Sequence, residues 1–461
     1  MTRIALPVHS YALRSKPASS SRLVNCFAEP LPPDAKSQAL LTRAPAVAAW
    51  TTVGSGPIYG MHAALERLFV ISGSSLYQIT TGKSATLLGS VGAPGNIDMD
   101  SNASSVVVVN EPNAYYYDGT FAQITDTDFA SRGAGDVEFL DNFLLFREPS
   151  SSRFFGSDLG SAFSYDALNF ATAEATPDKL VGLKVDHRQA LLFGETSVEL
   201  WENTGAAGFP FERSINGYVE QGCLNGRTVA KLDNSVFWLA DDYTVRRLDG
   251  ITPVRVSTHA IEQKLVLYTI SSAKGSTYAQ DGHLFYVLSF DEGTFVYDVT
   301  TQLWHERETY GVAGWEWGNP VSFSGKMLVG STTSNQIGEL SSFAYSDVGV
   351  SHQRMEWTYQ SVYAEQQRAF HDRLEMVFEA GVGLTTGQGS DPEVTLEYSD
   401  NGGQTFKALP SKKLGQIGEY ENRSVWWALG SARQRVYRAS ISDPVPVTLM
   451  DTFIEVRGGR I

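Results

Sequence analysis

Seven times along the chain, a short apolar run is followed by a polar turn and a second run that is often aromatic. Alternation of apolar and polar positions, rather than helical spacing, dominates these segments, and this is the pattern of β-strands. Each pair of runs therefore predicts a β-hairpin. The seven pairs are LFVISGSSLYQI from Leu68, VVVVNEPNAYYYDG from Val106, FLLFREPSSSRFFGS from Phe143, ALLFGETSVELWEN from Ala190, VFWLADDYTVRRLDG from Val236, LFYVLSFDEGTFVYDV from Leu284 and MLVGSTTSNQIGEL from Met327.

The pairs recur at a nearly constant spacing, with starts separated by 38, 37, 47, 46, 48 and 43 residues. Each unit leaves room for two further strands, as in a four-stranded propeller blade. Such a sheet buries both faces only when another sheet covers each side, so the blades must close into a ring. The pattern predicts an all-β fold with a β-propeller of about seven blades over residues 55–349. A series of unrelated hairpins in a β-sandwich protein is the alternative.

The two ends of the chain differ from this repeat. Residues 350–461 hold six longer alternating strands, which predict a β-sandwich-like domain. Residues 1–54 show little periodicity and include Pro30, Pro32, Pro33 and Pro45, so we expect an extended N-terminal arm, either disordered or lying across a neighbouring molecule. One segment within the repeat, Ser257–Leu265, has Ser and Thr followed by Glu and predicts a short helix.

Composition narrows the class of protein. Aromatic residues make up 11% of the 461 residues, which excludes a disordered chain because they can bury a large apolar surface. A net charge of −15 argues against a general nucleic-acid binder. The two cysteines, Cys26 and Cys223, cannot form a disulfide framework and are expected to be buried free thiols in a reducing compartment. No apolar run approaches 18 residues and no signal peptide is apparent, so we expect neither a membrane span nor secretion.

The sequence lacks the common catalytic and phosphate-binding motifs. Gly82-Lys83-Ser84 has Tyr77 where a phosphate-binding loop requires glycine, and His305-Glu306 is followed by Thr309 where a second metal-binding histidine would stand. No serine has glycine two residues before and two residues after it, so a nucleophile elbow is absent. We therefore expect no enzymatic activity, no metal site and no cofactor.

One local motif predicts a defined turn. The segment from Ser399 to Phe406 is similar to the Asp-box S-x-D-x-G-x-T-W/F of sialidase-like propellers, with Asn401 in place of the Asp. In such a hairpin the polar side chains fix the turn, glycine supplies positive φ and the aromatic residue packs beneath. The expected role is structural, and it involves Ser399, Asn401, Gly403, Thr405 and Phe406.

Charge is unevenly distributed along the chain. Residues 411–461 carry eight basic and five acidic side chains, so the rest of the chain is strongly acidic. Arg433, Arg435 and Arg438 fall along one predicted strand, with the first two on the same face. They are candidates for an interface with an acidic protein partner, since guanidinium groups bind carboxylates bidentately. A solvated strand face is the alternative.

Several stretches give the chain a resemblance to a known family. Near the start, RLVNCFAE from Arg22 and ALLTRAP from Ala39 resemble the opening arm N-x-(Y/F)-x-E…L-x-x-x-P-G of the packaged-DNA stabilisation proteins of short-tailed bacteriophages, with Ala46 in place of the last Gly. The order of Ile261-Glu262, Asp281–Leu284, Val296–Asp298 and Trp304 is similar to the family's last propeller blades. The C-terminal stretches are the most specific: Asp391–Val394, Tyr398–Gly403, Gly415–Tyr420, Arg423, Arg435–Arg438 and Ile441–Val445.

The resemblance implies a structural virion protein that forms the tail nozzle, or hub, of a short-tailed phage. Such proteins look like hexameric tubes below the portal and adaptor rings, which seal packaged DNA and carry the tail needle, tip, fibres or spikes. Genomic DNA would pass through the lumen without sequence-specific binding, and an acidic lumen would repel its phosphates. The protein would be made in the host cytoplasm and then become part of the tail.

Two other functions remain open on the sequence alone. The first is a receptor-binding or glycan-binding propeller that uses aromatic loops such as Trp315-Glu316-Trp317, although core packing explains these tryptophans better. The second is a sialidase-like hydrolase, which would need three clustered arginines, an acid, a tyrosine nucleophile and repeated Asp-boxes. The single altered box disfavours it.

Overall fold

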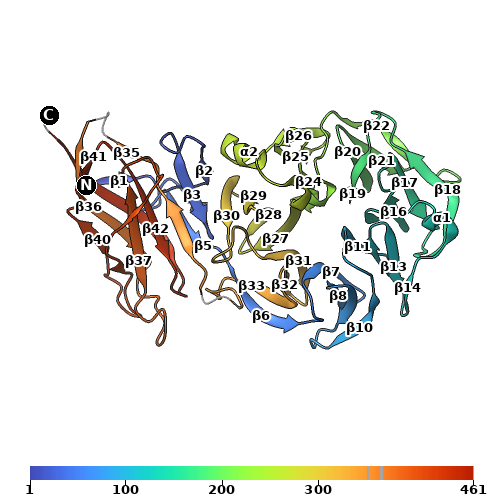
Figure 1. Ribbon diagram of the computed structural model, residues 1–461, viewed down its shortest axis with the longest axis horizontal. Coiled ribbons are helices and arrows are strands. Elements are labelled where there is room, and N and C mark those ends of the chain that lie inside the picture. The colour runs from blue at the N-terminus through green and yellow to red at the C-terminus, as the bar shows by residue number, and fades with distance from the viewer. Residues whose placement is uncertain (350–351, 364–366, 460–461) are drawn as a thin grey trace.

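The apolar runs form the interior strands of four-stranded antiparallel sheets that are arranged around a ring. The computed structural model describes all residues except 350–351, 364–366 and 460–461, and the ring lies beside a second β-domain (Figure 1). Five sheets follow one another along the chain. They are β7 (Ile58–Ala64), β8 (Arg67–Ser72), β9 (Ser75–Ile79) and β10 (Ala85–Ser90); β11 (Ile97–Ser101), β12 (Val106–Asn110), β13 (Asn113–Tyr117) and β14 (Phe121–Gln123); β15 (Val137–Leu140), β16 (Phe143–Arg147), β17 (Arg153–Ser157) and β18 (Tyr165–Thr172); β19 (Leu180–Asp186), β20 (Gln189–Gly194), β21 (Val198–Asn203) and β22 (Phe211–Val219); and β23 (Ala230–Leu232), β24 (Ser235–Leu239), β25 (Val245–Asp249) and β26 (Thr252–Arg255).

The remaining strands of the ring belong to two further sheets. One quartet is β27 (Lys274–Gln280), β28 (His283–Phe290), β29 (Gly293–Asp298) and β30 (Leu303–Arg307), and the last sheet is β31 (Trp317–Phe323), β32 (Lys326–Ser331), β33 (Gln336–Ser341) and β6 (Ala46–Thr52). The first strand of each sheet lies on the inside of the ring: β7 contacts both β11 and β31, and β27 contacts both β23 and β31. The second strands are buried on both faces, as the run Val106–Val109 shows with at most 1% exposure. Neighbouring sheets therefore cover one another, as a propeller requires.

The expected count of about seven blades is wrong, and six are found. Six four-stranded sheets stand alone, because the quartet β27–β30 is not a separate sheet. Its outer strand β30 pairs in parallel with β3 (Ser20–Val24) through Val24 and Glu306, which makes it part of a twelve-stranded sheet. A repeat read from local sequence cannot reveal this junction, since the joining strand lies nearly 300 residues away in the chain.

The C-terminal domain is a β-sandwich, as expected. One layer continues the twelve-stranded sheet, and the other has seven strands. The first layer holds β3, β34 (Met355–Thr358), β42 (Gln434–Ile441), β37 (Glu393–Ser399) and β38 (Lys407–Ala408), with β2 (Tyr11–Ala12), β35 (Val362–Tyr363) and β39 (Lys412–Lys413) at its sides; the second holds β4 (Cys26–Pro30), β5 (Ala39–Arg43), β43 (Thr448–Gly458), β36 (Ala369–Phe378), β40 (Ser424–Trp427), β1 (Thr2–Ile4) and β41 (Ser431–Ala432). Between the layers lies a core that includes Trp357, Tyr359, Leu374 and Tyr437, all fully buried.

An extended N-terminal arm over residues 1–54 is not found. Strands from this segment enter three sheets of the same chain: β1, β4 and β5 join the seven-stranded sheet, β3 joins the twelve-stranded sheet, and β6 completes the sheet of β31–β33. The prolines that suggested an arm lie at strand ends or in turns; Pro45, for instance, separates β5 from β6. The first residues therefore hold the two domains together instead of projecting from them.

Asn25 lies at the junction of the two domains. It adopts a left-handed backbone conformation with φ of 52° between β3 and β4. Its side-chain amide donates to the carbonyls of Glu308 and Arg354 at 2.9 Å each, and its Oδ1 accepts from the Glu308 N–H at 3.1 Å. Asparagine tolerates this conformation better than most residues. One side chain thus binds the end of the propeller quartet to the segment that precedes β34.

The short helix expected over Ser257–Leu265 is confirmed as α2 (His259–Leu265). The cap differs from the predicted one, because Thr258 makes no capping hydrogen bond and Ser257 instead donates to the Glu262 carboxylate at 2.6 Å. The other helices of the described residues are single turns: α1 (Thr127–Ala130), η1 (Gly226–Thr228) and η2 (Ile270–Ser272). Both cysteines are buried and free, as expected.

Candidate functional site

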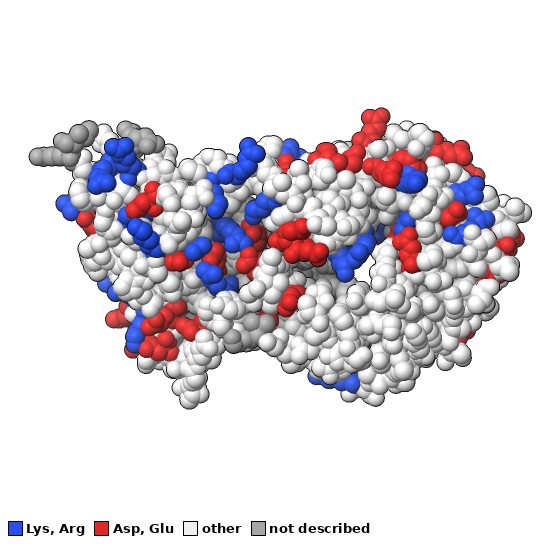
Figure 2. All heavy atoms as spheres, viewed as in Figure 1, with Lys and Arg blue, Asp and Glu red and all other residues white. Residues whose placement is uncertain are grey.

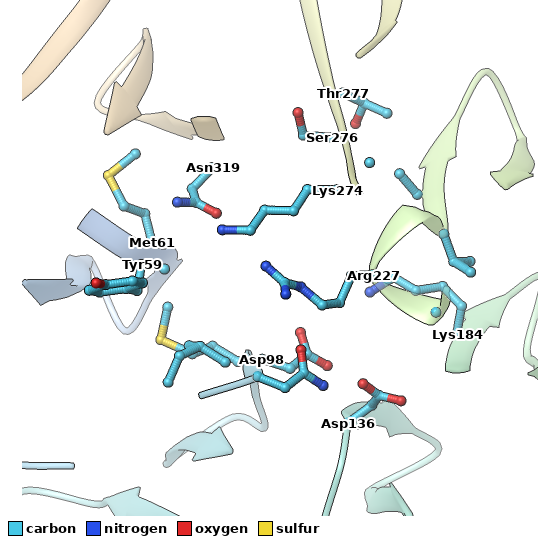
Figure 3. Close-up of a pocket in the computed structure, with 18 of the residues that line it drawn as sticks. Tyr59, Met61, Asp98, Asp136, Lys184, Arg227, Lys274, Ser276, Thr277 and Asn319 are labelled. Carbon is cyan, nitrogen blue, oxygen red and sulfur yellow. The ribbon is translucent and has the colours of Figure 1, made fainter. Parts of the chain in front are cut away.

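The inner strands of the propeller enclose a cavity of about 540 Å³, which we call the central cavity (Figure 3). Every inner strand except β15 contributes to its wall, and the loop before β15 contributes Asp136. Charged side chains reach this wall from several sheets, and they are Asp98, Asp136, Lys184, Arg227, Lys231 and Lys274. The cavity wall is thus polar and carries charges of both signs.

Most carboxylates near the central cavity have a structural role. Asp98 and Asp100 on β11 accept hydrogen bonds from the backbone N–H groups of Val137 and Phe139 at 3.0 and 2.7 Å. Glu138 on β15 accepts one in the same way from the Val185 N–H on β19 at 3.1 Å. Each inner strand has a free edge, and a buried N–H there needs an acceptor. The acidic side chains supply these acceptors and connect one sheet to the next.

The charged side chains near the central cavity influence one another's pKa values. Burial raises the pKa of Asp98 to about 6, with Asp136 and Glu138 adding to the effect and Lys184 opposing it. Burial also works against the charge on Lys184, but its ion pair with Glu138 and the nearby Asp98 outweigh this and raise the lysine pKa. Asp136 is paired with Arg147 at 2.6 Å. These carboxylates are engaged with cations or N–H groups, so none is poised as a free general base.

Neither metal binding nor sialidase-like catalysis finds support in the arrangement. Over the described ranges, no three His, Cys, Asp or Glu side chains gather in a way that could hold a metal ion. Among the residues that the structure describes, Arg227 is the only arginine on the central cavity wall, whereas a sialidase-like site would need three. Trp315 and Trp317, which a glycan-binding propeller would have to expose, are only 5% and 4% exposed. Helices long and apolar enough to cross a membrane do not occur in the described part of the chain.

The Asp-box-like residues lie together in the hairpin that follows β37. Asn401 organises the turn: its Oδ1 accepts from the Ser399 hydroxyl and from the N–H groups of Gln404 and Thr405, and its amide donates to the Thr405 hydroxyl. Gly403 has φ of 85° and donates its N–H to Ser399 Oγ at 2.9 Å. Phe406 lies under the Arg438 guanidinium, 4.0 Å from it.

We expect replacement of Asn401 by alanine to lower the free energy of unfolding by about 1–2 kcal/mol, because it removes four hydrogen bonds from an exposed turn. Asn401→Asp keeps the accepting oxygen and should cost less than half as much. Urea denaturation of both variants measures this. Equal stability of N401A and the parent would show that the turn is set by its glycines alone.

The three candidate interface arginines have different environments. Arg435 is 2% exposed and forms two hydrogen bonds to the Asp400 carboxylate, at 2.6 and 2.8 Å. Arg438 binds Glu397 at 2.7 Å. Arg433 is exposed and precedes β42, which begins at Gln434. Arg433 and Arg435 therefore do not share an exposed face, because Arg435 is used inside the domain.

The residues of the central cavity that matter most, Arg227 and Lys274, were not identified from the sequence. A usable signal did exist: Lys184, Arg227 and Lys274 stand near the starts of successive repeat units, 43 and 47 residues apart. That spacing matches the period of the hairpin repeat, and all three residues lie on the wall of the central cavity.

Known structures resemble the chain only distantly. The match to the extracellular domain of the putative one-component system BT4673 from B. thetaiotaomicron covers 88% of this chain and 58% of that one, at 9% identity and a TM-score of 0.44. The match to YCF48 from Cyanidioschyzon merolae covers 64% of this chain and 99% of that one, with 10% identity and a TM-score of 0.41. The match to Kluyveromyces lactis Hsv2 covers 62% of this chain and 97% of that one, with 12% identity and a TM-score of 0.35. No curated protein sequence matches the chain.

Two family models match consecutive parts of the chain. The model described as bacteriophage P22 Gp10, beta-propeller, matches residues 18–345, and the model described as bacteriophage P22 Gp10, beta-sandwich, matches residues 354–457. The two matches follow the two domains of the fold and leave only the chain ends and a short connection uncovered. They confirm the resemblance seen in the sequence: the chain belongs to the bacteriophage P22 Gp10 family, and it is a structural phage tail protein and a component of the virion.

Proposed function

We propose that this protein forms the tail nozzle of a short-tailed bacteriophage, attached below the portal and adaptor rings. There it seals the packaged DNA and provides the channel for genome ejection. The observation that carries the proposal is the match to the P22 Gp10 family across both domains. The net charge of −15 supports it, because an acidic tube lets a duplex pass without binding its phosphates.

The proposed assembly is a homo-hexamer that contacts the adaptor ring on one side and the needle, tip, fibre or spike proteins on the other. Its subunits need faces that can be buried with little loss of hydration free energy from charged groups. In Figure 2, acidic side chains gather over the upper edge of the propeller near β20 and β22, while the region of β7–β10 is almost without charge. Residues 55–97 contain only Glu66, Arg67 and Lys83 as charged residues. Interface centres are depleted in charge in this way.

The folded N-terminus changes how subunits would associate. Since residues 1–54 are used within their own chain, the proposed hexamer relies on the surfaces of the folded domains. Among the three candidate arginines, exposed Arg433 is the one still available to an acidic partner such as the adaptor protein.

Deletion of the gene tests the proposal. We expect heads that fill with DNA and then lose it, with truncated tails, measured as nuclease-sensitive DNA and by electron microscopy. Supply of the wild-type gene on a plasmid is the matched control and should restore both. Particles that retain their DNA but fail to adsorb would instead support a receptor-binding role, and particles normal in both respects would refute both functions.

A further inference from the structure

Two cations in the central cavity lack partners. Arg227 on η1 and Lys274 on β27 point into the space from adjacent elements, and Figure 3 shows their charged ends near each other. Across the described residues, neither side chain makes an ion pair or a side-chain hydrogen bond. Other cations at this wall are neutralised: Lys184 pairs with Glu138, and Lys231 lies 3.8 Å from Asp186. Two positive charges therefore face one cavity without a counter-ion.

This arrangement is unfavourable without a ligand. Burial and the charge of Arg227 lower the pKa of Lys274 to about 8, with Asp291 opposing the shift only in part. Burial also lowers the pKa of Arg227. A lowered lysine pKa marks a protonated form that the surroundings do not stabilise. An anion placed between the two groups would reverse both effects.

The backbone on which the two side chains stand is closely packed. A Cβ on Gly275 would lie 2.1 Å from the Thr228 carbonyl oxygen, and one on Gly226 would lie 1.9 Å from the Val181 carbonyl oxygen. Only glycine permits these approaches, so the backbones of β27, η1 and β19 pack closely against one another. The Asn225 side chain fixes η1 further by accepting the Arg227 N–H at 3.0 Å. The backbone positions of Arg227 and Lys274 are thus set before a ligand binds, which favours ligand binding.

We propose that the central cavity binds a small phosphate-bearing ligand, whose phosphate lies between the Arg227 guanidinium and the Lys274 ammonium. A planar guanidinium binds phosphate oxygens bidentately, and an ammonium adds a point charge. The volume of about 540 Å³ admits a small organic phosphate as well as the free ion. The nearby carboxylates do not oppose this, because Asp98 binds the Val137 N–H and lies beside Lys184 while Asp136 binds Arg147.

Calorimetric titration of the full chain with inorganic phosphate at low ionic strength tests the site. We expect saturable binding, and affinity about tenfold weaker in Arg227→Gln and in Lys274→Gln. Lys231→Gln is the matched control, since Lys231 lines the same cavity but already has an acidic neighbour. Its affinity should stay within about twofold of the parent. Absence of saturable binding at millimolar phosphate, or an equal loss in K231Q, would overturn the proposal.

Thermal melting separates binding from folding. Without phosphate, R227Q and K274Q should melt no lower than the parent, because each removes an unpartnered charge; a marked loss of stability would contradict the proposal. With phosphate, the parent and K231Q should gain more stability than R227Q and K274Q, as linkage requires. Succinate in place of phosphate serves as the second probe, and tighter binding of this dicarboxylate would refute the phosphate assignment. These measurements use the isolated chain, so they succeed or fail independently of the nozzle proposal.

Discussion

Replacement of Arg43 by methionine is expected to lower the free energy of unfolding by about 3–5 kcal/mol. Arg43 ends β5 and is 7% exposed. Its guanidinium donates to four backbone carbonyls of the sandwich at 2.8–3.1 Å, those of Gln353, Ile441, Asp443 and Val445. Burial lowers its pKa to about 10, so the charge is tolerated only because these acceptors surround it. Methionine fills the space and leaves the carbonyls unsatisfied.

Urea unfolding at neutral pH measures the effect. The matched control is Arg188→Met, because the Arg188 side chain is 81% exposed and its ion pair with Asp141 spans 2.9 Å at the surface. Exposed pairs contribute at most about 1 kcal/mol, so R188M should differ little from the parent. A cost for R43M no larger than that for R188M would mean that water replaces the guanidinium at the four carbonyls.

Removal of residues 1–52 is expected to prevent folding of both domains. The deletion takes away β3, which lies inside the twelve-stranded sheet between β30 and β34, and β6, which completes the sheet of β31–β33. It also removes Leu23, Cys26 and Leu41 from the sandwich core. Unpaired strand edges of this kind promote aggregation. We expect insoluble protein, or soluble protein without a cooperative melting transition by circular dichroism.

Removal of residues 1–8 provides the control. It deletes β1, which pairs only with β43 at the side of the seven-stranded sheet. This shorter chain should remain soluble and melt cooperatively, at a slightly lower temperature. If the chain without residues 1–52 melted like the parent, the strand pairings of the N-terminal segment would be dispensable for folding.

The sequence predicted those parts of the fold that local patterns determine. The valine run from Val106 and the segment Ser257–Leu265 carry their own signals of strand and helix. The pairing of β6 with β33 carries none, since hydrogen bonds between Ala46–Thr52 and Gln336–Ser341 follow from ring closure and not from either segment. The prolines near residue 30 therefore suggested an arm where strands are formed.

The same limit applies to the site. The Asp-box residues were recognisable because the turn is local, and the hydrogen bonds of Asn401 all lie between Ser399 and Thr405. Arg227 and Lys274 become neighbours only when η1 and β27 pack together. Their lack of counter-ions is likewise a property of the folded wall, because sequence cannot show which of the 51 acidic side chains lie within reach.

The closing of the ring by β6 also sets the timing of folding during synthesis. The ribosome delivers β6 long before its partner β33, so the strand AVAAWTT must wait, unpaired, until the rest of the propeller has emerged. Pairing between strands so far apart in the sequence slows folding and leaves an unpaired strand edge that is prone to aggregation. If two nascent copies lie close together, β6 of one can enter the open sheet of the other with the same hydrogen bonds, and the exchanged strands would link the two chains.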